Sequence, residues 1–350
     1  MTAYRSGVVA ADFHPVTRAF FRGRTVAVPG GSGFIGSHVV EQLLELEALP
    51  RVLSRRENPP FLAHLGARID RRVCDLADLG QAREAMRGCS VVLHLAATVA
   101  GVEYNAAHPA SIFQSNLAGF FGSIRAAADL RVERFLVTSS ACVYPRDCAI
   151  PTPESEGFRD EPEPTNSGYG WAKRMEEFLG AKYAEEFGLS VAIARPYNAY
   201  GPRDNFDPKS SHVIPALILR AFRSQDGALR VWGDGSHSRS FLYVDDFARG
   251  LLEVAARHPK AEALNLGADE EVTIRETAEM VARHVSAARG VRLTPVFDPR
   301  GLTGQPRRHC ETTRIEAALG YRARVSLDEG LRRTVAWFKD HEDLALSPHA

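Results

Sequence analysis

Two side chains in the segment YGWAK have the spacing of an acid–base pair. Tyr169 and Lys173 lie four residues apart near the start of a predicted helix, and therefore on one face of it. An ammonium beside a phenol stabilises the phenolate, so we expect Lys173 to lower the pKa of Tyr169 from about 10 toward neutrality. The spacing alone is common. Combined with Ser140 at the end of a predicted strand, and with a glycine-rich turn upstream, it indicates an acid–base site.

A cysteine, Cys142, follows Ser140 in the segment TSSACVYP. A lone cysteine in an apolar run is usually a small core residue. A thiol also ionises close enough to neutral pH to serve as an acid or a base where its surroundings are polar. The residue type alone leaves both interpretations of Cys142 open.

A turn rich in glycine precedes these residues in the segment VAVPGGSGFIGSHVV. Gly30, Gly33 and Gly36 recur every three residues, directly after a predicted strand and directly before a predicted helix. Glycines there let the chain turn sharply and let its backbone approach a pyrophosphate, which the N-terminus of the helix attracts. The strand, turn and helix together predict a dinucleotide-binding site.

The end of the second predicted strand bears on the choice between NAD and NADP. A site for NAD usually has an aspartate or glutamate there, whereas a site for NADP prefers cations that bind the additional phosphate. This chain has Ser54, Arg55 and Arg56 in the segment LSRREN and lacks the acid. Two solvated loop arginines are the simpler interpretation, but the missing acid and the added charge both favour NADP, with NAD as the alternative.

The elements that must position these residues alternate between short apolar strands and longer helices. The strands are rich in β-branched residues, and most of them are apolar enough to be buried on both faces. They are predicted at residues 24–28, 51–53, 71–74, 91–96, 134–140 and 190–196. Helical periodicity is clearest at 36–47, 111–130 and 168–188. This alternation predicts an α/β fold of the Rossmann type, a doubly wound parallel sheet with helices on both faces.

After residue 196 the pattern loosens, which predicts a smaller, discontinuous C-terminal region that binds the substrate. The segment 229–257 is expected to return to the sheet as a strand, a turn and a helix, and further helices are expected at 213–222, 273–288 and 327–339. The predicted units are an N-terminal extension of unknown role (1–23), a dinucleotide-binding domain (24–195 plus 231–266) and a substrate-binding region (196–230 plus 267–345).

Composition argues against several classes of protein. The chain of 350 residues carries 43 basic and 43 acidic side chains, which gives no general electrostatic case for a nucleic-acid or membrane partner. No apolar run approaches the roughly 20 residues of a membrane helix, and no signal pattern is present. The five cysteines are widely spaced without a Cys-x-x-Cys pair, which argues against disulfides or a zinc site and suits the cytosol. We therefore expect a cytoplasmic protein without a metal.

The glycine turn, CDLAD, HLAA, SSACVYP, YGWAK and WGDGSHSRSFLYVDD together resemble the extended short-chain dehydrogenase/reductases that act on nucleotide-activated sugars. The resemblance covers nearly the whole chain after residue 23. It implies that Ser140, Tyr169 and Lys173 form the catalytic set, that Lys173 also touches the nicotinamide ribose, and that helices 111–129 and 169–187 form a homodimer. Further cofactor contacts that it implies are Phe34, Ile35, Asp75, Leu76, Ala96 and Ala97, with Asp75 and Leu76 flanking the adenine.

Within this family, the residue type at position 142 separates the reactions. Dehydratases carry an Asp-Glu pair after the serines, and this chain has Ala141 and Cys142 instead, which puts dehydration in doubt. GDP-L-fucose synthases and GDP-mannose 3,5-epimerases place a cysteine there, and both remove protons adjacent to a ketone. Inverting such a carbon needs a base on one face and an acid on the other. The segment NFDPKSSHVIPALILRAF resembles the fucose synthases, in which the histidine pairs with the cysteine, so His212 is the expected partner.

The resemblance therefore implies an NADPH-dependent epimerase/reductase of a GDP-linked 4-keto-6-deoxy sugar. Cys142 and His212 would exchange protons at carbons 3 and 5, and hydride transfer to carbon 4 would follow, with Tyr169 protonating the oxygen. Substrate contacts are expected from Asn198, Lys209, Arg220, Trp232, Arg239 and Arg307. Three alternatives stay open: a redox-neutral 3,5-epimerase that retains NAD, a redox-neutral 4-epimerase, and a cofactor-sensing binding protein without turnover. Ser32, where fucose synthases have arginine, and the long stretch 57–72 depart from their pattern.

Overall fold

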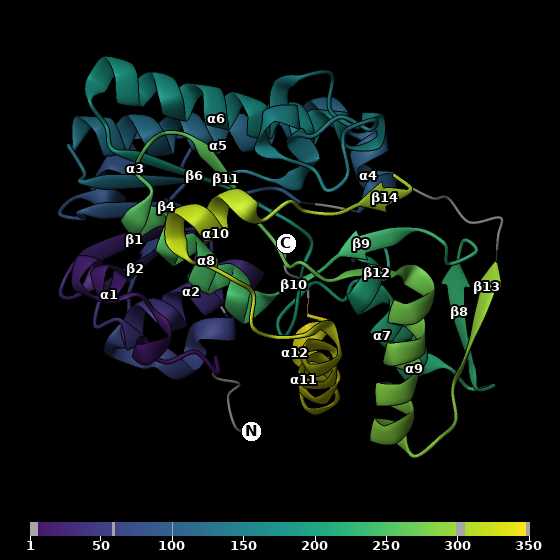
Figure 1. The fold of residues 1–350 in the computed structure, drawn as a ribbon. Coiled ribbons are helices and arrows are strands. Elements are labelled where there is room, and N and C mark those ends of the chain that lie inside the picture. The colour runs from purple at the N-terminus through teal and green to yellow at the C-terminus, as the bar shows by residue number, and fades with distance from the viewer. Residues whose placement is uncertain (1–5, 58–59, 100, 299–304, 348–350) are drawn as a thin grey trace.

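A seven-stranded parallel sheet forms the centre of the protein (Figure 1). The structure, a computed structural model, describes residues 6–57, 60–99, 101–298 and 305–347. The strand order is β11-β6-β5-β4-β1-β2-β3. The strands are β1 (Thr25–Pro29), β2 (Leu49–Ser54), β3 (Asp70–Val73), β4 (Val91–His94), β5 (Arg134–Thr138), β6 (Val191–Pro196) and β11 (Ala263–Leu266). The predicted Rossmann-type α/β fold is confirmed, because the predicted strands form this parallel sheet and all but the edge strand β3 are largely buried.

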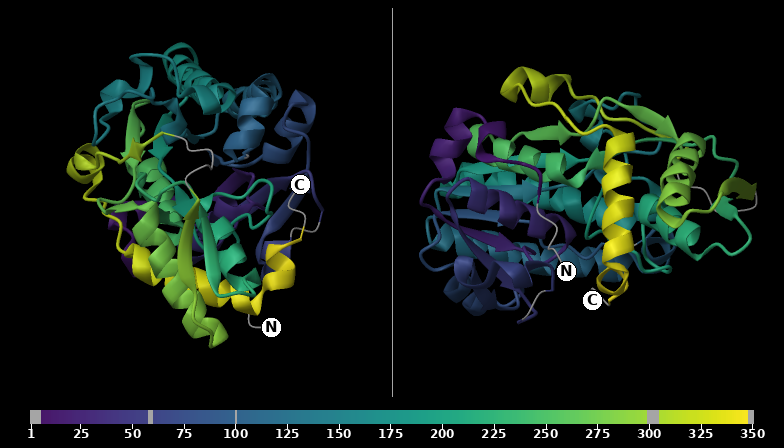
Figure 2. Two further views of the ribbon diagram at one scale, coloured as in Figure 1. Left: turned by 90° about the vertical axis from the view of Figure 1, so that its right-hand side faces the viewer. Right: turned by 90° about the horizontal axis from the view of Figure 1, so that it is seen from below.

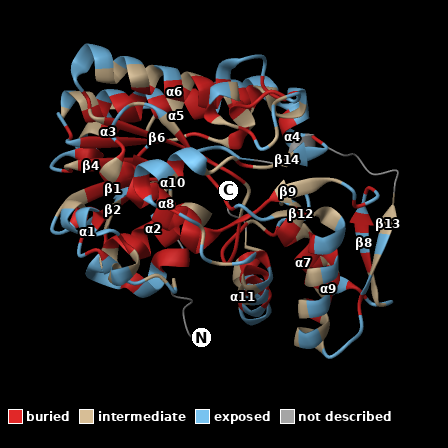
Figure 3. Ribbon diagram, viewed as in Figure 1, coloured by how far each residue is buried: buried red, intermediate tan, exposed pale blue. Residues whose placement is uncertain are grey.

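Helices cover both faces of the sheet (Figures 1 and 3). On one face lie α3 (Leu79–Met86), α5 (Pro109–Asp129) and α6 (Ser167–Phe187), and on the other lie α1 (Pro15–Phe21), α2 (Phe34–Glu45) and α8 (Val244–Arg257). Phe120 of α5 packs in one buried cluster with Val92 of β4. Val39 of α2 packs in another with Val26 and Val28 of β1. Two apolar layers therefore enclose the strands, as a parallel sheet requires.

A second region lies beside one end of the sheet (Figure 2). Its helices α7 (Val213–Arg223), α9 (Ile274–Arg289) and α11 (Leu327–Asp340) pack around a separate apolar cluster. Two small sheets complete it, β8 (Ala228–Trp232) with β13 (Thr294–Asp298), and β9 (Ser238–Ser240) between β12 (Glu271–Thr273) and β14 (Arg307–Arg308). The remaining α-helices and β-strands of the described residues are α4 (Val102–Ala107), α10 (Thr313–Leu319), α12 (Glu342–Ala345), β7 (Ala199–Tyr200) and β10 (Leu242–Tyr243).

One expectation about this region is wrong. The strand predicted near the start of 229–257 does not return to the main sheet, because β8 pairs in parallel with β13. The seventh strand of the main sheet is β11, which pairs with β6. The predicted boundaries near 196 and 266 fall at the ends of β6 and β11, and we retain the division into two regions as a proposal.

Part of the predicted N-terminal extension is an integral element of the fold. Phe21 of α1 is fully buried and joins the apolar cluster beneath β1. The hydroxyl of Thr17 donates a hydrogen bond to Glu253 of α8 at 2.7 Å, and the backbone N–H of Gly7 donates to Asp245 of the same helix. Residues 1–5 of the predicted extension lie outside the described residues. Residues 6–23 therefore contact both α8 and the apolar cluster beneath β1, and connect this helix to the sheet.

Truncating Phe21 tests this structural role. Because its ring is fully buried, Phe21→Ala is expected to lower the free energy of unfolding by about 3–5 kcal/mol, measured by urea denaturation. Val16 on the same helix is 53% exposed, so Val16→Ala should change that free energy by less than about 0.5 kcal/mol. Equal effects of the two substitutions would show that the extension is not part of the core.

Candidate active site

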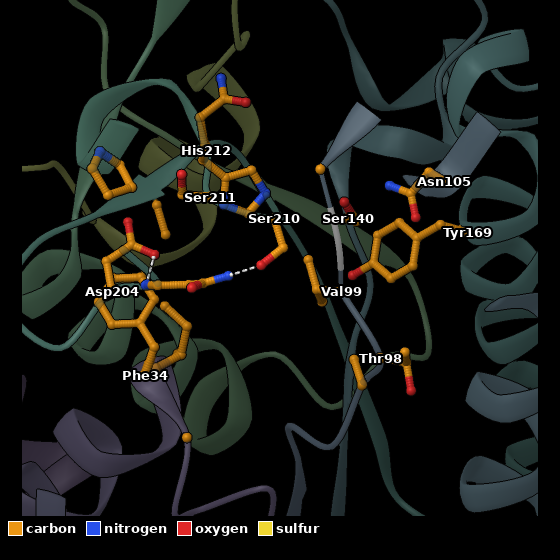
Figure 4. A pocket seen from close by; sticks show the side chains of 18 of the residues that line it. Phe34, Thr98, Val99, Asn105, Ser140, Tyr169, Asp204, Ser210, Ser211 and His212 are labelled. Carbon is orange, nitrogen blue, oxygen red and sulfur yellow. Dashed lines mark hydrogen bonds between the residues drawn. The ribbon is translucent and has the colours of Figure 1, made fainter. Parts of the chain in front are cut away.

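A large cleft runs along the carboxyl edge of the parallel sheet. Its volume is about 2150 Å³, well above the roughly 300–1,000 Å³ of a site for one drug-sized molecule. Lining residues come from the β1–α2 turn, from the ends of β2 to β6, and from α7 and β8 of the second region. Figure 4 shows Ser140 and Tyr169 on one side of this space and Asp204 and His212 on the other. The cleft can therefore hold a dinucleotide and a second large ligand together.

The turn between β1 and α2 provides a bare surface for a pyrophosphate. Gly30 has a φ of 78°, which glycine adopts readily, and a Cβ there would lie 2.6 Å from the backbone nitrogen of Ala96. Gly33 is the N-cap of α2, so the first amides of that helix point toward the cleft. Gly36 packs against the backbone of Gly30, where a side chain would collide. The turn therefore fits an NAD-type cofactor.

The end of β2 carries the residues from which the sequence predicts a preference for NADP over NAD. Ser54, Arg55 and Arg56 line the cleft, and within the described segments no carboxylate forms an ion pair with either guanidinium. The hydroxyl of Ser54 accepts the backbone N–H of Arg56 at 2.9 Å and the hydroxyl of Ser32 at 3.1 Å. Two cations and two hydroxyls thus gather at one point. The other predicted cofactor contacts also line the cleft, namely Phe34, Ile35, Asp75, Leu76, Ala96 and Ala97.

Ser140, Tyr169 and Lys173 lie together at the centre of the cleft. Tyr169 comes from the first turn of α6, and Ser140 lines the same cleft. The ammonium of Lys173 lies 5.5 Å from the centroid of the tyrosine ring. Burial raises the pKa of Tyr169 to about 12, although Lys173 and Ser140 act to lower it. Our expectation of a lowered pKa is therefore wrong, and at neutral pH the phenol is protonated.

A buried carboxylate holds the lysine in place. Lys173 is 2% exposed, and its Nζ donates to Oε2 of Glu176 at 2.8 Å. Burial acts to lower the pKa of Lys173, but Glu176 and Tyr169 outweigh it and raise the pKa above its ordinary value. Burial also raises the pKa of Glu176 to about 7. Lys173 therefore stays a cation beside the tyrosine.

A single turn of 3-10 helix, η3 (Ala141–Val143), presents Cys142 to the cleft. The hydroxyl of Ser140 accepts the backbone N–H of Cys142 at 3.1 Å. Gly170 of α6 packs on this turn, and a Cβ there would lie 2.5 Å from the carbonyl oxygen of Cys142. The guanidinium of Arg308 approaches the sulfur, with Nη1 3.8 Å from Sγ. Cys142 is only partly buried and lies beside the acid–base set rather than in an apolar cluster.

His212 reaches the cleft from the second region. It is the N-cap of α7, and its side chain makes no capping hydrogen bond. The imidazole is exposed to the cleft, yet desolvation by the surrounding protein lowers its pKa below the ordinary value. The ring is therefore neutral at neutral pH. Figure 4 places it across the cleft from Tyr169.

The predicted substrate contacts divide into two groups. Those that line the cleft are Asn198, Lys209, Arg220, Trp232 and Arg239. The guanidinium of Arg220 lies 4.6 Å from the centroid of the Trp232 ring. Arg307 is exposed and forms hydrogen bonds of 2.6 and 2.7 Å with Glu271 outside the cleft. Successive side chains of a strand point to opposite sides, so the sequence neighbour Arg308 lines the cleft instead.

Asp204 is a cleft residue that sequence reasoning missed. Its side chain is 2% exposed, and its Oδ1 accepts the backbone N–H of Asn205 at 2.7 Å. Its Oδ2 is buried without a hydrogen-bond partner among the described residues. Burial raises the pKa of Asp204 to about 8, so the carboxyl is mostly protonated at neutral pH. The polar segment DNFDPKSS gives no signal of this burial.

The sequence and the fold match known proteins over most of the chain. Residues 26–267 match the NAD dependent epimerase/dehydratase family. A dTDP-4-dehydro-6-deoxy-D-allose reductase from Streptomyces bikiniensis is 33% identical over 91% of this chain and 97% of the relative. A GDP-L-fucose synthase from Escherichia coli is 32% identical over the same shares. The solved structure of an epimerase from Methanothermobacter thermautotrophicus matches with a TM-score of 0.81, covering 95% of this chain and 98% of that chain at 26% identity.

The carboxyl of Asp204 gives a pH-dependent test of this side of the cleft. Its pKa is about 8 in the fold against an ordinary 3.8, so between these values the folded state binds more protons at this group, and the contribution of this carboxyl to wild-type stability falls as pH rises. Asn cannot ionise. The stability of Asp204→Asn relative to wild type, from urea midpoints, is therefore expected to increase from pH 5 to pH 8. The exposed Asp207 supplies the control, since Asp207→Asn should show no such trend. A pH-independent difference for Asp204→Asn would mean that the carboxyl is ionised in the fold.

Proposed function

The chain belongs to the NAD dependent epimerase/dehydratase family, and we propose that it is an NADPH-dependent epimerase/reductase of a GDP-linked 4-keto-6-deoxy sugar. Cys142 and His212 exchange protons at carbons 3 and 5, and Tyr169 then protonates the oxygen on carbon 4 as that carbon is reduced. The observation that carries this proposal is the position of Cys142 in the cleft, on the turn next to Ser140 and against the helix that bears Tyr169.

The state of Tyr169 supports the reductive half of the reaction. A dinucleotide held along the glycine turn would supply a hydride to carbon 4. The oxygen on that carbon then needs a proton, and a phenol with a pKa of about 12 is protonated at neutral pH. The Lys173 ammonium near the ring stabilises the phenolate that remains after the transfer. Ser140 acts on the pKa of the phenol in the same direction.

The positions of Cys142 and His212 support the epimerising half. A ketone at carbon 4 acidifies the hydrogens on carbons 3 and 5, and inversion at either carbon needs a proton acceptor on one face and a donor on the other. The neutral imidazole of His212 is ready to accept a proton. Cys142 supplies a thiol beside the acid–base set of Ser140 and Tyr169. The two groups come from different regions of the chain and line one cleft.

A second candidate function is reduction without epimerisation, on a dTDP-linked 4-keto sugar. The relative from Streptomyces bikiniensis, named a dTDP-4-dehydro-6-deoxy-D-allose reductase, is as similar to this chain as the fucose synthase is. Both candidates use Ser140, Tyr169 and Lys173 in the same way. They differ in whether Cys142 and His212 move protons.

Exposed aromatic side chains on α5 and α6 support a homodimer. The two helices lie side by side on one face of the sheet (Figure 1). Phe121 of α5 is 50% exposed, and Phe178 and Phe187 of α6 are 53% and 49% exposed. Trp171 lies two helical turns before Phe178 and is also exposed. Aromatic residues are enriched at protein interfaces, so we propose that a second copy of the chain covers this face.

Turnover in heavy water tests the proposed function. The purified protein is incubated with NADPH and with GDP- or dTDP-linked 4-keto-6-deoxy sugars, and the products are analysed by NMR. We expect NADPH oxidation with the GDP-linked sugar and deuterium at carbons 3 and 5. Cys142→Ser should nearly abolish the deuterium because a hydroxyl is a far weaker acid than a thiol. Tyr169→Phe should slow reduction by about 10²-fold or more while exchange continues.

The outcomes of this experiment separate the candidates. Cys148, a partly buried cysteine whose sulfur contacts Thr152, gives the matched control, and Cys148→Ser should keep both activities. Reduction of the dTDP-linked sugar without deuterium incorporation would favour the second candidate. Exchange without NADPH oxidation, in a protein that purifies with NAD, would identify a redox-neutral epimerase.

The cofactor preference is tested at Arg55 and Arg56. Each charge-assisted contact with the additional phosphate of NADP contributes about 1.5–3 kcal/mol, so the pair favours NADPH over NADH by well over tenfold. Replacing both arginines by alanine should raise the KM for NADPH and leave the KM for NADH nearly unchanged, in steady-state kinetics with the same sugar. Equal losses with both cofactors would contradict phosphate recognition by these residues.

A further inference from the structure

A guanidinium from the second region lies against the Cys142 thiol. Nη1 of Arg308 donates to Sγ at 3.8 Å, and both residues line the cleft. Arg308 lies on β14, which pairs with β9, whereas Cys142 lies on η3 next to the end of β5. The contact therefore joins two segments that are 166 residues apart in the sequence.

The arginine is held in this orientation by a buried amide. Nε of Arg308 donates to Oε1 of Gln305 at 3.1 Å. Gln305 is 6% exposed, and its Nε2 donates to the carbonyl oxygen of Arg146 at 2.8 Å. Arg146 follows η3 by three residues. The chain of contacts thus returns to the segment that carries Cys142, and fixes the guanidinium relative to the sulfur.

The charged groups that face Cys142 from α6 contribute positive charge, and the carboxylate among them is already paired with a cation. The Lys173 ammonium acts on the thiol at short range, and Glu176 is bound to that ammonium. Tyr169 is a neutral phenol at neutral pH. On the buried side of η3, Nε of Arg174 donates to the carbonyl of Val143.

On the other side of the thiol, too, the positive charges are not offset by a free anion. Arg239 of β9 lies near Arg308, and its pKa is lowered to about 10 by burial and then by Arg308. The buried Glu163 acts on Arg239. His212 on the far side of the cleft is neutral at neutral pH. Among these groups, Arg308 is the one that donates to the sulfur itself.

We propose that Arg308 stabilises the thiolate form of Cys142 and aims its sulfur at the sugar, so that Arg308 is a positioning residue for the proton transfer. This rests on the proposed function. A charge-assisted contact favours the thiolate over the thiol. In the step itself, His212 takes a proton from the carbon next to the ketone, and the electron pair of the broken C–H bond forms the enolate. The Cys142 thiol then donates its proton to that carbon on the opposite face, which restores the ketone and leaves the sulfur as a thiolate beside Arg308.

The planar guanidinium suits this task better than an ammonium. Arg308 keeps Nε on Gln305 while Nη1 points at the sulfur, which are two donors in a fixed geometry. A lysine at position 308 has one flexible ammonium and cannot make both contacts at the same time. Arg308→Lys is therefore expected to keep the charge but lose the alignment.

The test is the pH dependence of Cys142 alkylation by iodoacetamide, followed by mass spectrometry of the labelled peptide. Only the thiolate reacts, and no sugar is needed. For Arg308→Gln we expect the midpoint of the rate–pH curve to rise by about one unit, so that the rate at pH 7 falls about tenfold. Arg308→Lys should give a smaller shift. The exposed Arg314, paired with Glu262 far from the cleft, supplies the control Arg314→Gln, which should match wild type.

Deuterium exchange on the 4-keto sugar gives the second readout. In Arg308→Gln the exchange rate should fall at pH 7, with the KM for the sugar nearly unchanged. A raised KM with an unchanged alkylation curve would overturn the proposal and make Arg308 a ligand of the substrate diphosphate. If no 4-keto sugar turns over, the proposed function fails, but the alkylation shift still decides whether Arg308 stabilises the thiolate. If Arg308→Gln does not fold, unchanged alkylation and exchange in folded Arg308→Lys would also overturn the proposal.

Discussion

A buried ion pair between Arg195 and Glu177 holds together the elements that carry the candidate active site. Arg195 of β6 donates from Nε and Nη2 to the two carboxylate oxygens of Glu177 at 2.8 and 2.7 Å, and both side chains are 5% exposed. Glu177 lies on α6, two turns after Tyr169, and also accepts the hydroxyl of Ser139, which precedes Ser140. Removing one partner of such a pair costs about 3–5 kcal/mol because a buried charge is left uncompensated. The strand end, the helix and β6 therefore keep a fixed arrangement.

The same network reaches the edge of the sheet. Nη1 of Arg195 donates to the hydroxyl of Tyr144 and to the carbonyl of Glu154, and the Tyr144 hydroxyl donates to Asn265 of β11. Tyr144 directly follows the turn that presents Cys142. Groups held in this way need little reorganisation when a substrate binds, which is how positioning contributes to catalysis.

Burial also sets the protonation states in the cleft. It raises the pKa of Tyr169 and of Asp204 and lowers that of His212, so these three groups are uncharged at neutral pH. The cations Lys173 and Arg308 lie near the catalytic turn. A cleft of neutral proton donors and acceptors with fixed cations suits a substrate that carries phosphates and develops negative charge on oxygen.

The amino-acid sequence by itself determined the sheet, the glycine turn and the Tyr169–Lys173 pair, because these features depend on neighbours within a few residues. Buried strands are continuous β-branched runs, and a helix places residues four apart on one face. The tertiary structure alone decided the pairing of β8 with β13, and the choice of Arg308 over Arg307 for the cleft. It also determined which polar side chains are buried: burial raises the pKa of Tyr169, and Asp204 is buried although it lies in a polar segment of the sequence. Strand partners, the side of a strand that faces a cleft, and desolvation all depend on segments far away in the chain, which local patterns do not encode.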